Sequence, residues 1–142
     1  MKKYKIGYTS GVFDLFHVGH LNILERAKQY CDYLIVGVST DELTFKLKGK
    51  FPTISYAQRA RIIDSIKYVD EVIAENNVDK YLAWENIHYD VLFKGSDASK
   101  KASYKEYEKK LNAVGVDVIY FPYTDGISSS IIKQMQQENN KK

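Results

Sequence analysis

The sequence is poor in cysteine, proline and tryptophan. Its 142 residues include one cysteine, two prolines and one tryptophan. The lone cysteine, Cys31, cannot form a disulfide within the chain, which excludes a disulfide-stapled fold and is typical of a reducing compartment. No Pro/Gly-rich linker or low-complexity tract divides the chain. We therefore expect a single domain over residues 1–142, with a frayed tail at residues 136–142.

Long apolar runs and a strong charge of one sign are also missing. The run DYLIVGV is far too short to span a bilayer, and no apolar run of signal-peptide length follows the first lysines. We therefore expect a cytoplasmic protein without membrane insertion. The net charge of +3 comes without a basic stripe, a zinc spacing or an RNA-binding signature. This pattern argues against a nucleic-acid partner and is compatible with a small anionic ligand.

What the sequence does contain is a series of apolar runs of strand length, near residues 6, 35, 72, 92 and 119. Segments with helical spacing separate them, and this alternation predicts βαβ units and a parallel sheet. The runs are nearly continuous in Val, Ile, Leu and Tyr, as expected when helices cover both faces of the sheet. We predict a Rossmann-like, doubly wound α/β fold with a five-stranded parallel sheet, in which ligands bind beyond the carboxyl ends of the strands.

Two segments between and after these runs have their own expectations. Residues 40–54, TDELTFKLKGKFPTI, have weak periodicity and two breakers, so we expect a long functional loop there. A last helix should begin near Ser128 or Ser129, whose hydroxyls can cap it.

The stretch GVFDLFHVGH, residues 11–20, joins the first predicted strand to a predicted helix that starts at Val18 or Gly19. His17 and His20 then lie on one face at the helix N-terminus, where amides and the helix dipole favour a phosphate. Gly11 permits a tight turn, and Gly19 permits close approach of an anion. Spacing alone leaves a metal ligand, a general base and an anion site open. No other histidine or cysteine has a recognisable zinc spacing, so the anion site is favoured. Asp14 is a candidate for an N-cap or a turn-fixing residue.

The same stretch resembles the H-x-G-H signature of the nucleotidyltransferase superfamily that contains the cytidylyltransferases. YTDGISSS, residues 123–130, resembles the R-T-x-G-I-S-T-T element of glycerol-3-phosphate cytidylyltransferases. ERAKQYCDYLIVGVSTDE and SYAQRARIIDSIKYVDEVI look like the matching segments between these two elements. The resemblance therefore covers nearly the whole chain.

The resemblance implies a reaction of CTP with sn-glycerol 3-phosphate that yields CDP-glycerol and diphosphate. The substrate phosphate attacks the α-phosphate in line, without a protein nucleophile, and Mg²⁺ accompanies the triphosphate. The partners implied are CTP, a phosphorylated small alcohol and a second copy of the chain in a homodimer. The pathway implied is the synthesis of teichoic acid or another surface polysaccharide.

The resemblance also implies roles for individual residues, but it does not fix the set of residues that hold a metal. His17, His20 and Lys50 are the implied catalytic residues. Lys48, Arg59 and Lys67 are the implied substrate contacts, with the alternative that Arg59 fixes a carboxylate. Asp97 is an implied metal or nucleotide contact, with a turn-stabilising role as the alternative. The implied nucleotide-binding positions are Gly11, Val12, Phe13, His17, Gly19, His20, Asp97, Tyr123, Thr124, Gly126, Ile127, Ser128 and Ser129.

Three positions depart from the family pattern. One is Lys67, which stands where cytidylyltransferases have arginine. Tyr123 stands in place of the signature arginine, and Val12 stands where many relatives carry threonine. Tyrosine cannot neutralise a developing negative charge, so another cation must do so, and Lys94 and Lys133 are the candidates. The alternatives are a cytidylyltransferase for another phosphoalcohol, an adenylyltransferase that uses ATP and a sugar phosphate, and an inactive nucleotide-binding protein.

Overall fold

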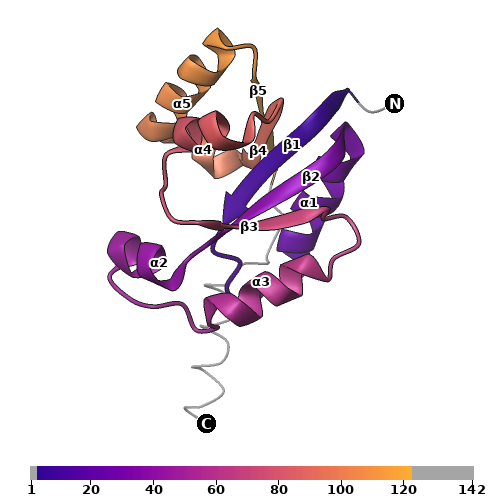
Figure 1. Ribbon diagram of the computed structural model, residues 1–142. Helices are drawn as coiled ribbons and strands as arrows, with labels where there is room; N and C mark the ends of the chain where they lie inside the picture. The colour runs from indigo at the N-terminus through magenta and orange to yellow at the C-terminus, as the bar shows by residue number, and fades with distance from the viewer. Residues whose placement is uncertain (1–2, 123–142) are drawn as a thin grey trace.

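The computed structural model describes residues 3–122 and confirms the predicted α/β fold. Within these residues, five parallel strands form one sheet in the order β3-β2-β1-β4-β5. The strand order reverses at β1, because β2 and β3 lie on one side of it and β4 and β5 on the other (Figure 1). The strands are β1 (Tyr4–Gly11), β2 (Cys31–Ser39), β3 (Glu71–Glu75), β4 (Val91–Gly95) and β5 (Asp117–Phe121).

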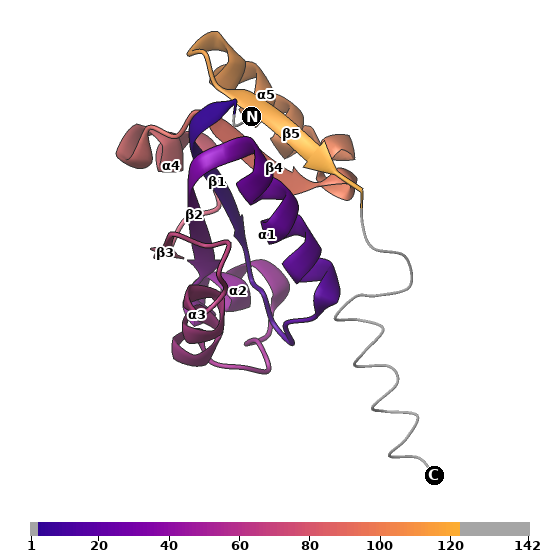
Figure 2. The same cartoon turned by 90° about the vertical axis from the view of Figure 1, so that its right-hand side faces the viewer.

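Helices cover both faces of the sheet, as the continuous apolar strands predicted. Figure 2 shows α1 in front of the sheet and α5 behind it. The face toward α1 and α3 is packed by Leu24, Ala27 and Ile63, and the opposite face by side chains that include Tyr104 and Leu111. The helices are α1 (Val18–Tyr30), α2 (Asp41–Lys48), α3 (Tyr56–Asp64), α4 (Lys80–Ile87) and α5 (Ala102–Ala113), and a short 3-10 helix, η1 (Ser96–Lys100), follows β4.

The expectation of a loop over residues 40–54 was wrong for its first half, which forms α2. Thr40 caps this helix, because its hydroxyl oxygen accepts the Leu43 amide at 3.1 Å. Gly49 ends it in the left-handed conformation, with φ of 76°. The cap and the stop were both visible in the sequence. The helical pattern was not, because α2 buries only Leu43 and Thr44.

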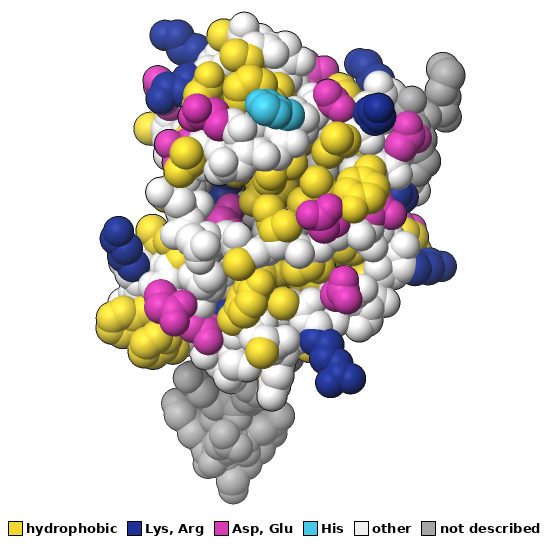
Figure 3. All heavy atoms as spheres, viewed as in Figure 1, with side chains coloured by type: hydrophobic (Ala, Val, Ile, Leu, Met, Phe, Trp, Pro, Cys, Tyr) yellow, Lys and Arg dark blue, Asp and Glu magenta, His cyan; other side chains and the backbone are white. Residues whose placement is uncertain are grey.

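The α4 helix was also missed, although it too has a cap in its sequence. The Asp79 carboxylate accepts the amides of Tyr81 and Leu82 at 2.9 and 3.2 Å. Below α4, apolar side chains gather in a band over β2 and β3 (Figure 3). In the part of the chain from residue 3 to 122, no helix is long and apolar enough to cross a bilayer.

The reversal of strand order places the ends of β1 and β4 side by side. In an open parallel sheet, neighbouring strands whose connections leave in opposite directions open a crevice at their carboxyl ends. Residues 11–20 leave β1 at this crevice, and η1 leaves β4 there. The predicted last helix near Ser128 or Ser129 and the tail at 136–142 lie outside the described residues.

Candidate functional site

The α1 helix begins with a reciprocal cap made by two imidazoles. His17 is the N-cap, and its Nδ1 atom accepts the Gly19 amide at 3.0 Å. The Nδ1 atom of His20 in turn accepts the His17 amide at 3.3 Å. This arrangement satisfies two amides in the way that a Ser/Glu capping box does. The prediction that the helix begins at Val18 or Gly19 is confirmed.

The cap also decides which nitrogen of each ring carries a proton. A ring nitrogen that accepts a hydrogen bond has no proton, so a neutral imidazole in this position carries its proton on Nε2. Burial lowers the pKa of His17, and burial together with the charges of His17 and Lys94 lowers the pKa of His20 to about 4. Both rings are therefore neutral near pH 7, and each presents an Nε2–H donor.

This proton arrangement discriminates among the three roles that spacing alone left open. A metal ligand or a general base needs a free lone pair on Nε2, and these rings carry a proton there as long as Nδ1 accepts an amide. A phosphate oxygen instead needs a donor, which Nε2–H supplies. The geometry of His17 and His20 favours the anion site.

The loop between β1 and α1 turns at Phe13 and Leu15, which have positive φ values of 54° and 52°. The expectation that Gly11 makes this turn was wrong, since the described residues with positive φ do not include it. A Cβ atom on Gly11 would lie 3.3 Å from the Phe13 ring, so the glycine instead makes room for that ring. The Phe13 ring packs edge-on against His20, with centroids 5.5 Å apart. Positive φ in such residues costs about 1–3 kcal/mol each and requires support from outside the loop.

Asp14 supplies part of that support and has the turn-fixing role that the sequence suggested for it. Its two carboxylate oxygens accept the amides of Thr53 and Ile54 at 2.8 and 2.9 Å. The loop after β1 is therefore tied to the residues that follow the lysines of α2. The N-cap of α1 is His17 and not Asp14.

Arg59 supplies the rest of that support from a buried position in α3. Only 1% of its surface is exposed. Its Nη1 atom donates to the carbonyls of Val12 and Ser39 at 2.7 and 2.8 Å, and its Nη2 atom pairs with Asp41 at 2.7 Å. Nε donates to the Ile54 carbonyl at 2.8 Å, so all three guanidinium nitrogens are engaged. This geometry supports the carboxylate-fixing alternative and gives no support to a substrate contact.

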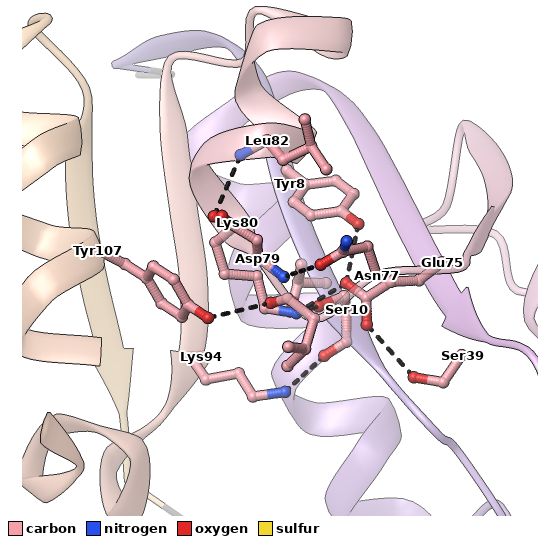
Figure 4. A network of polar contacts seen from close by, with 12 residues as sticks. Tyr8, Ser10, Ser39, Glu75, Asn77, Asp79, Lys80, Leu82, Lys94 and Tyr107 are labelled. Carbon is pink, nitrogen blue, oxygen red and sulfur yellow. Dashed lines mark hydrogen bonds and ion pairs between the residues drawn. The ribbon is translucent and has the colours of Figure 1, made fainter. Parts of the chain in front are cut away.

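A buried polar network lies behind the ends of β1, β2 and β3 (Figure 4). Lys80 pairs with Glu75 at 2.7 Å and donates to the Ser10 hydroxyl at 2.7 Å. Glu75 also accepts the hydroxyls of Ser39 and Tyr8, both at 3.3 Å. This network was not predicted from the sequence. Its one signal there is a pair of opposite charges five residues apart, Glu75 and Lys80, and such pairs are usual on solvated surfaces.

The remaining predicted residues are spread over the described chain. Lys48 and Lys50 are exposed at the end of α2 and just after it. Asp97 is exposed in η1, two residues after β4 ends at the crevice. Lys67 is exposed between α3 and β3, with its ammonium 5.2 Å from the centroid of the Tyr68 ring. That place is at the amino end of β3, the opposite edge of the sheet from the histidines, so the chain does not bring Lys67 to them.

Seven predicted positions belong to the second signature or to the segment after it. Those in the second signature follow β5, whose carboxyl end lies at the same edge of the sheet as the crevice. Tyr123, Thr124, Gly126, Ile127, Ser128, Ser129 and Lys133 lie outside the described residues.

The described side chains do not by themselves form a cage for a metal ion. Between residues 3 and 122, no group of three or more His, Cys, Asp or Glu side chains is arranged to hold a metal ion. Mg²⁺ needs no such cage, since enzymes commonly hold it by substrate phosphates and one or two carboxylates. Asp97, exposed beside the crevice, fits that requirement.

The family comparison agrees with this geometry. A family model described as cytidylyltransferase-like matches residues 8–135. Glycerol-3-phosphate cytidylyltransferase of Bacillus spizizenii is 44% identical over 128 residues, which are 89% of this chain and 92% of that protein. FAD synthase of Thermococcus sibiricus is 36% identical over 124 residues, which are 86% of this chain and 84% of that protein.

A solved structure has the same fold. The lipopolysaccharide core biosynthesis protein from Thermoplasma volcanium superposes with a TM-score of 0.70 and 27% identity. The match covers 85% of this chain and 97% of that protein.

Proposed function

Because the chain belongs to the cytidylyltransferase-like family, we propose that it transfers the cytidylyl group of CTP to sn-glycerol 3-phosphate. The products are CDP-glycerol and diphosphate. The observation that carries the proposal is the pair of neutral imidazoles at the start of α1, which present two Nε2–H donors at the strand-order reversal. The similarity to glycerol-3-phosphate cytidylyltransferases, at 38–44% identity over most of the chain, supports the choice of nucleotide and acceptor.

The reaction needs positioned charge and hydrogen bonds more than it needs a protein nucleophile. An oxygen of the acceptor phosphate attacks the α-phosphorus of CTP, and the bond from the α-phosphorus to the bridging oxygen breaks. That oxygen leaves with the diphosphate. His17 and His20 would donate from Nε2 to phosphate oxygens that gain charge in this step. Their reciprocal cap holds the rings in place before the substrate arrives, which is the condition for effective electrostatic stabilisation.

Lys48 and Lys50 would bring mobile positive charge to the same phosphates. Both are exposed, and Lys50 is three residues before Thr53, whose amide is held by Asp14. Three residues span about 10 Å at most, so Lys50 stays tethered near the loop that carries the histidines. Lysines on such a tether can close over a bound triphosphate or over the acceptor phosphate.

Mg²⁺ would be held by the triphosphate, with Asp97, two residues after the end of β4, as a protein carboxylate for it. When bound, it would supply further neutralisation of the phosphate charge.

The test is pyrophosphate release by the purified protein with Mg²⁺ and glycerol 3-phosphate, in parallel reactions with CTP and with ATP. We expect release with CTP that depends on glycerol 3-phosphate. Release with ATP and not with CTP would overturn the cytidylyl assignment. The similarity to an FAD synthase, named for an adenine dinucleotide, is the reason to include ATP. Binding of CTP without pyrophosphate from any phosphoalcohol would instead indicate an inactive nucleotide-binding protein.

A homodimer remains part of the proposal. The apolar band below α4 is a surface that a second copy of the chain would cover (Figure 3). On the α4 side, Leu82 is 40% exposed and lines the same hollow as Ile73 of β3. Sedimentation equilibrium of the purified protein would give the mass, and a monomer at micromolar concentration would contradict this part of the proposal.

A further inference from the structure

Lys94 is the next-to-last residue of β4, at the carboxyl edge where the strand order reverses. Its ammonium donates to the Ser10 carbonyl at 2.6 Å, just before the chain enters the histidine loop. Figure 4 shows the side chain reaching from β4 toward the end of β1, beside the Glu75–Lys80 network. Lys94 therefore lies at the carboxyl edge of the sheet, on the strand next to the one that leads into the histidine loop.

The charge of this ammonium is not matched by a carboxylate in the described chain. The ion pairs within residues 3–122 join Lys28 to Asp70, Arg59 to Asp41 and Lys80 to Glu75. Glu75, a neighbouring acid, is already engaged by Lys80 at 2.7 Å and by two hydroxyls. An ammonium has three donors, and the described residues accept one from Lys94.

The pKa of Lys94 agrees with this shortage of acceptors and of negative charge around its ammonium. Burial and the positive charge of Lys80 lower the pKa of Lys94 to about 8, and Lys101 adds to this effect. Glu75 and Asp97 oppose the shift but do not cancel it. Lys94 in turn is one of the charges that lower the pKa of His20. Lys94 and His20 therefore lie within electrostatic range of each other. An anion bound between them at this edge of the sheet would stabilise the charge of Lys94 and accept a bond from His20.

We infer that Lys94 is a phosphate ligand of the nucleotide, whose ammonium binds the triphosphate beside His17 and His20 and supplies the fixed positive charge of the site. The inference rests on the proposed nucleotide-dependent function, and it extends that function to a residue outside the two signatures. The inference distinguishes two kinds of cation near the proposed phosphate site. Lys94 is partly buried and held by the Ser10 carbonyl, whereas Lys48 and Lys50 are exposed on a tether.

The first test compares K94M, K94R and K109M. Methionine keeps most of the length of the lysine stem and removes the charge, and Lys109 is an exposed lysine of α5 that serves as the matched control. The measurements are the dissociation constants of CTP and of inorganic tripolyphosphate by calorimetry, with thermal melts to establish folding. We expect K94M to weaken both by about ten- to hundredfold. K94R should recover most of the loss because it keeps the charge, and K109M should stay within about twofold of the wild type. Unchanged affinities in a folded K94M protein would overturn the inference.

The second test uses the unmodified chain, so it holds even if K94M does not fold. Protein labelled with ¹⁵N at the lysine ammonium groups is titrated by NMR from pH 6 to 11, with and without tripolyphosphate, and K94R assigns the resonance. Binding of an anion at Lys94 should raise its pKa from about 8. A pKa that stays the same with saturating tripolyphosphate would contradict a contact.

Both tests use an inorganic phosphate chain without an acceptor, so they separate the two proposals. If the wild type binds tripolyphosphate through Lys94 but releases no pyrophosphate from CTP and glycerol 3-phosphate, the proposed reaction fails and the inference about Lys94 stands. If the wild type is active and K94M binds and turns over CTP as well as the wild type does, the inference fails and the reaction stands.

Discussion

The imidazole rings of His17 and His20 stack with centroids 4.0 Å apart and 24° between their planes. Each ring uses Nδ1 to accept an amide of the helix start that it caps. The two residues that cap the helix are therefore also the two that carry Nε2–H donors in the loop after β1. Substitutions that keep the capping acceptor but remove the Nε2–H donor test the site directly.

Replacing His17 by asparagine or by glutamine should separate capping from donation. The asparagine carbonyl oxygen can take the place of Nδ1 and asparagine is a favoured N-cap, but it offers no donor where Nε2 was. We expect H17N to keep its stability within about 1 kcal/mol and to lose about a hundredfold in kcat. H17Q places an amide donor near Nε2, so it should be less stable but retain more activity than H17N. Chemical denaturation and pyrophosphate release measure the two properties, and full activity in H17N would contradict the phosphate-donor role.

The free energy of unfolding should decrease as the pH is lowered below neutrality, because of His20. Its pKa is lowered from 6.5 to about 4 in the folded chain, so between these values the unfolded chain binds more protons. The free energy of unfolding must then decrease as pH falls through this window, by at most about 1.4 kcal/mol per pH unit for one proton. H20N keeps an acceptor for the His17 amide and removes the titration, so urea denaturation between pH 7 and 5 should show a shallower slope than in the wild type. Equal slopes for the two proteins would show that His20 is not the group responsible.

Arg59 should matter for stability more than for substrate binding. Replacing it with methionine leaves the carbonyls of Val12 and Ser39 and the Asp41 carboxylate without their donor. We expect R59M to lower the free energy of unfolding by about 3 kcal/mol, because two carbonyls and a partly exposed carboxylate lose their donor together. R61M, at an exposed position of the same helix, should cost less than about 0.5 kcal/mol. Urea denaturation compares the two, and a stable R59M protein with weakened substrate binding would restore the substrate-contact interpretation.

Lys50 should affect turnover without affecting stability, since its side chain is exposed. We expect K50A to lower kcat/KM by about tenfold, equal to about 1.4 kcal/mol, with an unchanged melting temperature. Lys46 is exposed on α2 and provides a matched substitution, K46A, for which we expect a change of less than about twofold. Steady-state kinetics with CTP and the acceptor varied in turn would show which substrate Lys50 contacts. Equal effects of the two substitutions would indicate a general effect of positive charge instead of a specific phosphate contact by Lys50.

The elements that the sequence predicted correctly are those whose pattern is local. Strands buried on both faces are continuous apolar runs, and each of the five predicted strands is present in the described chain. The start of α1 was predicted because a helix N-terminus is signalled by residues within one turn of it. The α2 helix was missed because its exposed face carries lysines and apolar residues together, so the helical period is weak in its sequence.

The residue types near the site were predictable from the sequence, but the place and role of each residue were not. By itself, the sequence determined that two histidines follow the first strand and that lysines follow the second, since these are facts of order and spacing. Only the tertiary structure decided that Arg59 lies inside the protein, that Lys67 lies at the far edge of the sheet, and that Lys94 meets the end of β1. Those outcomes depend on which strands become neighbours, and the pairing of β1 with β4 joins residues 84 positions apart that no local pattern relates.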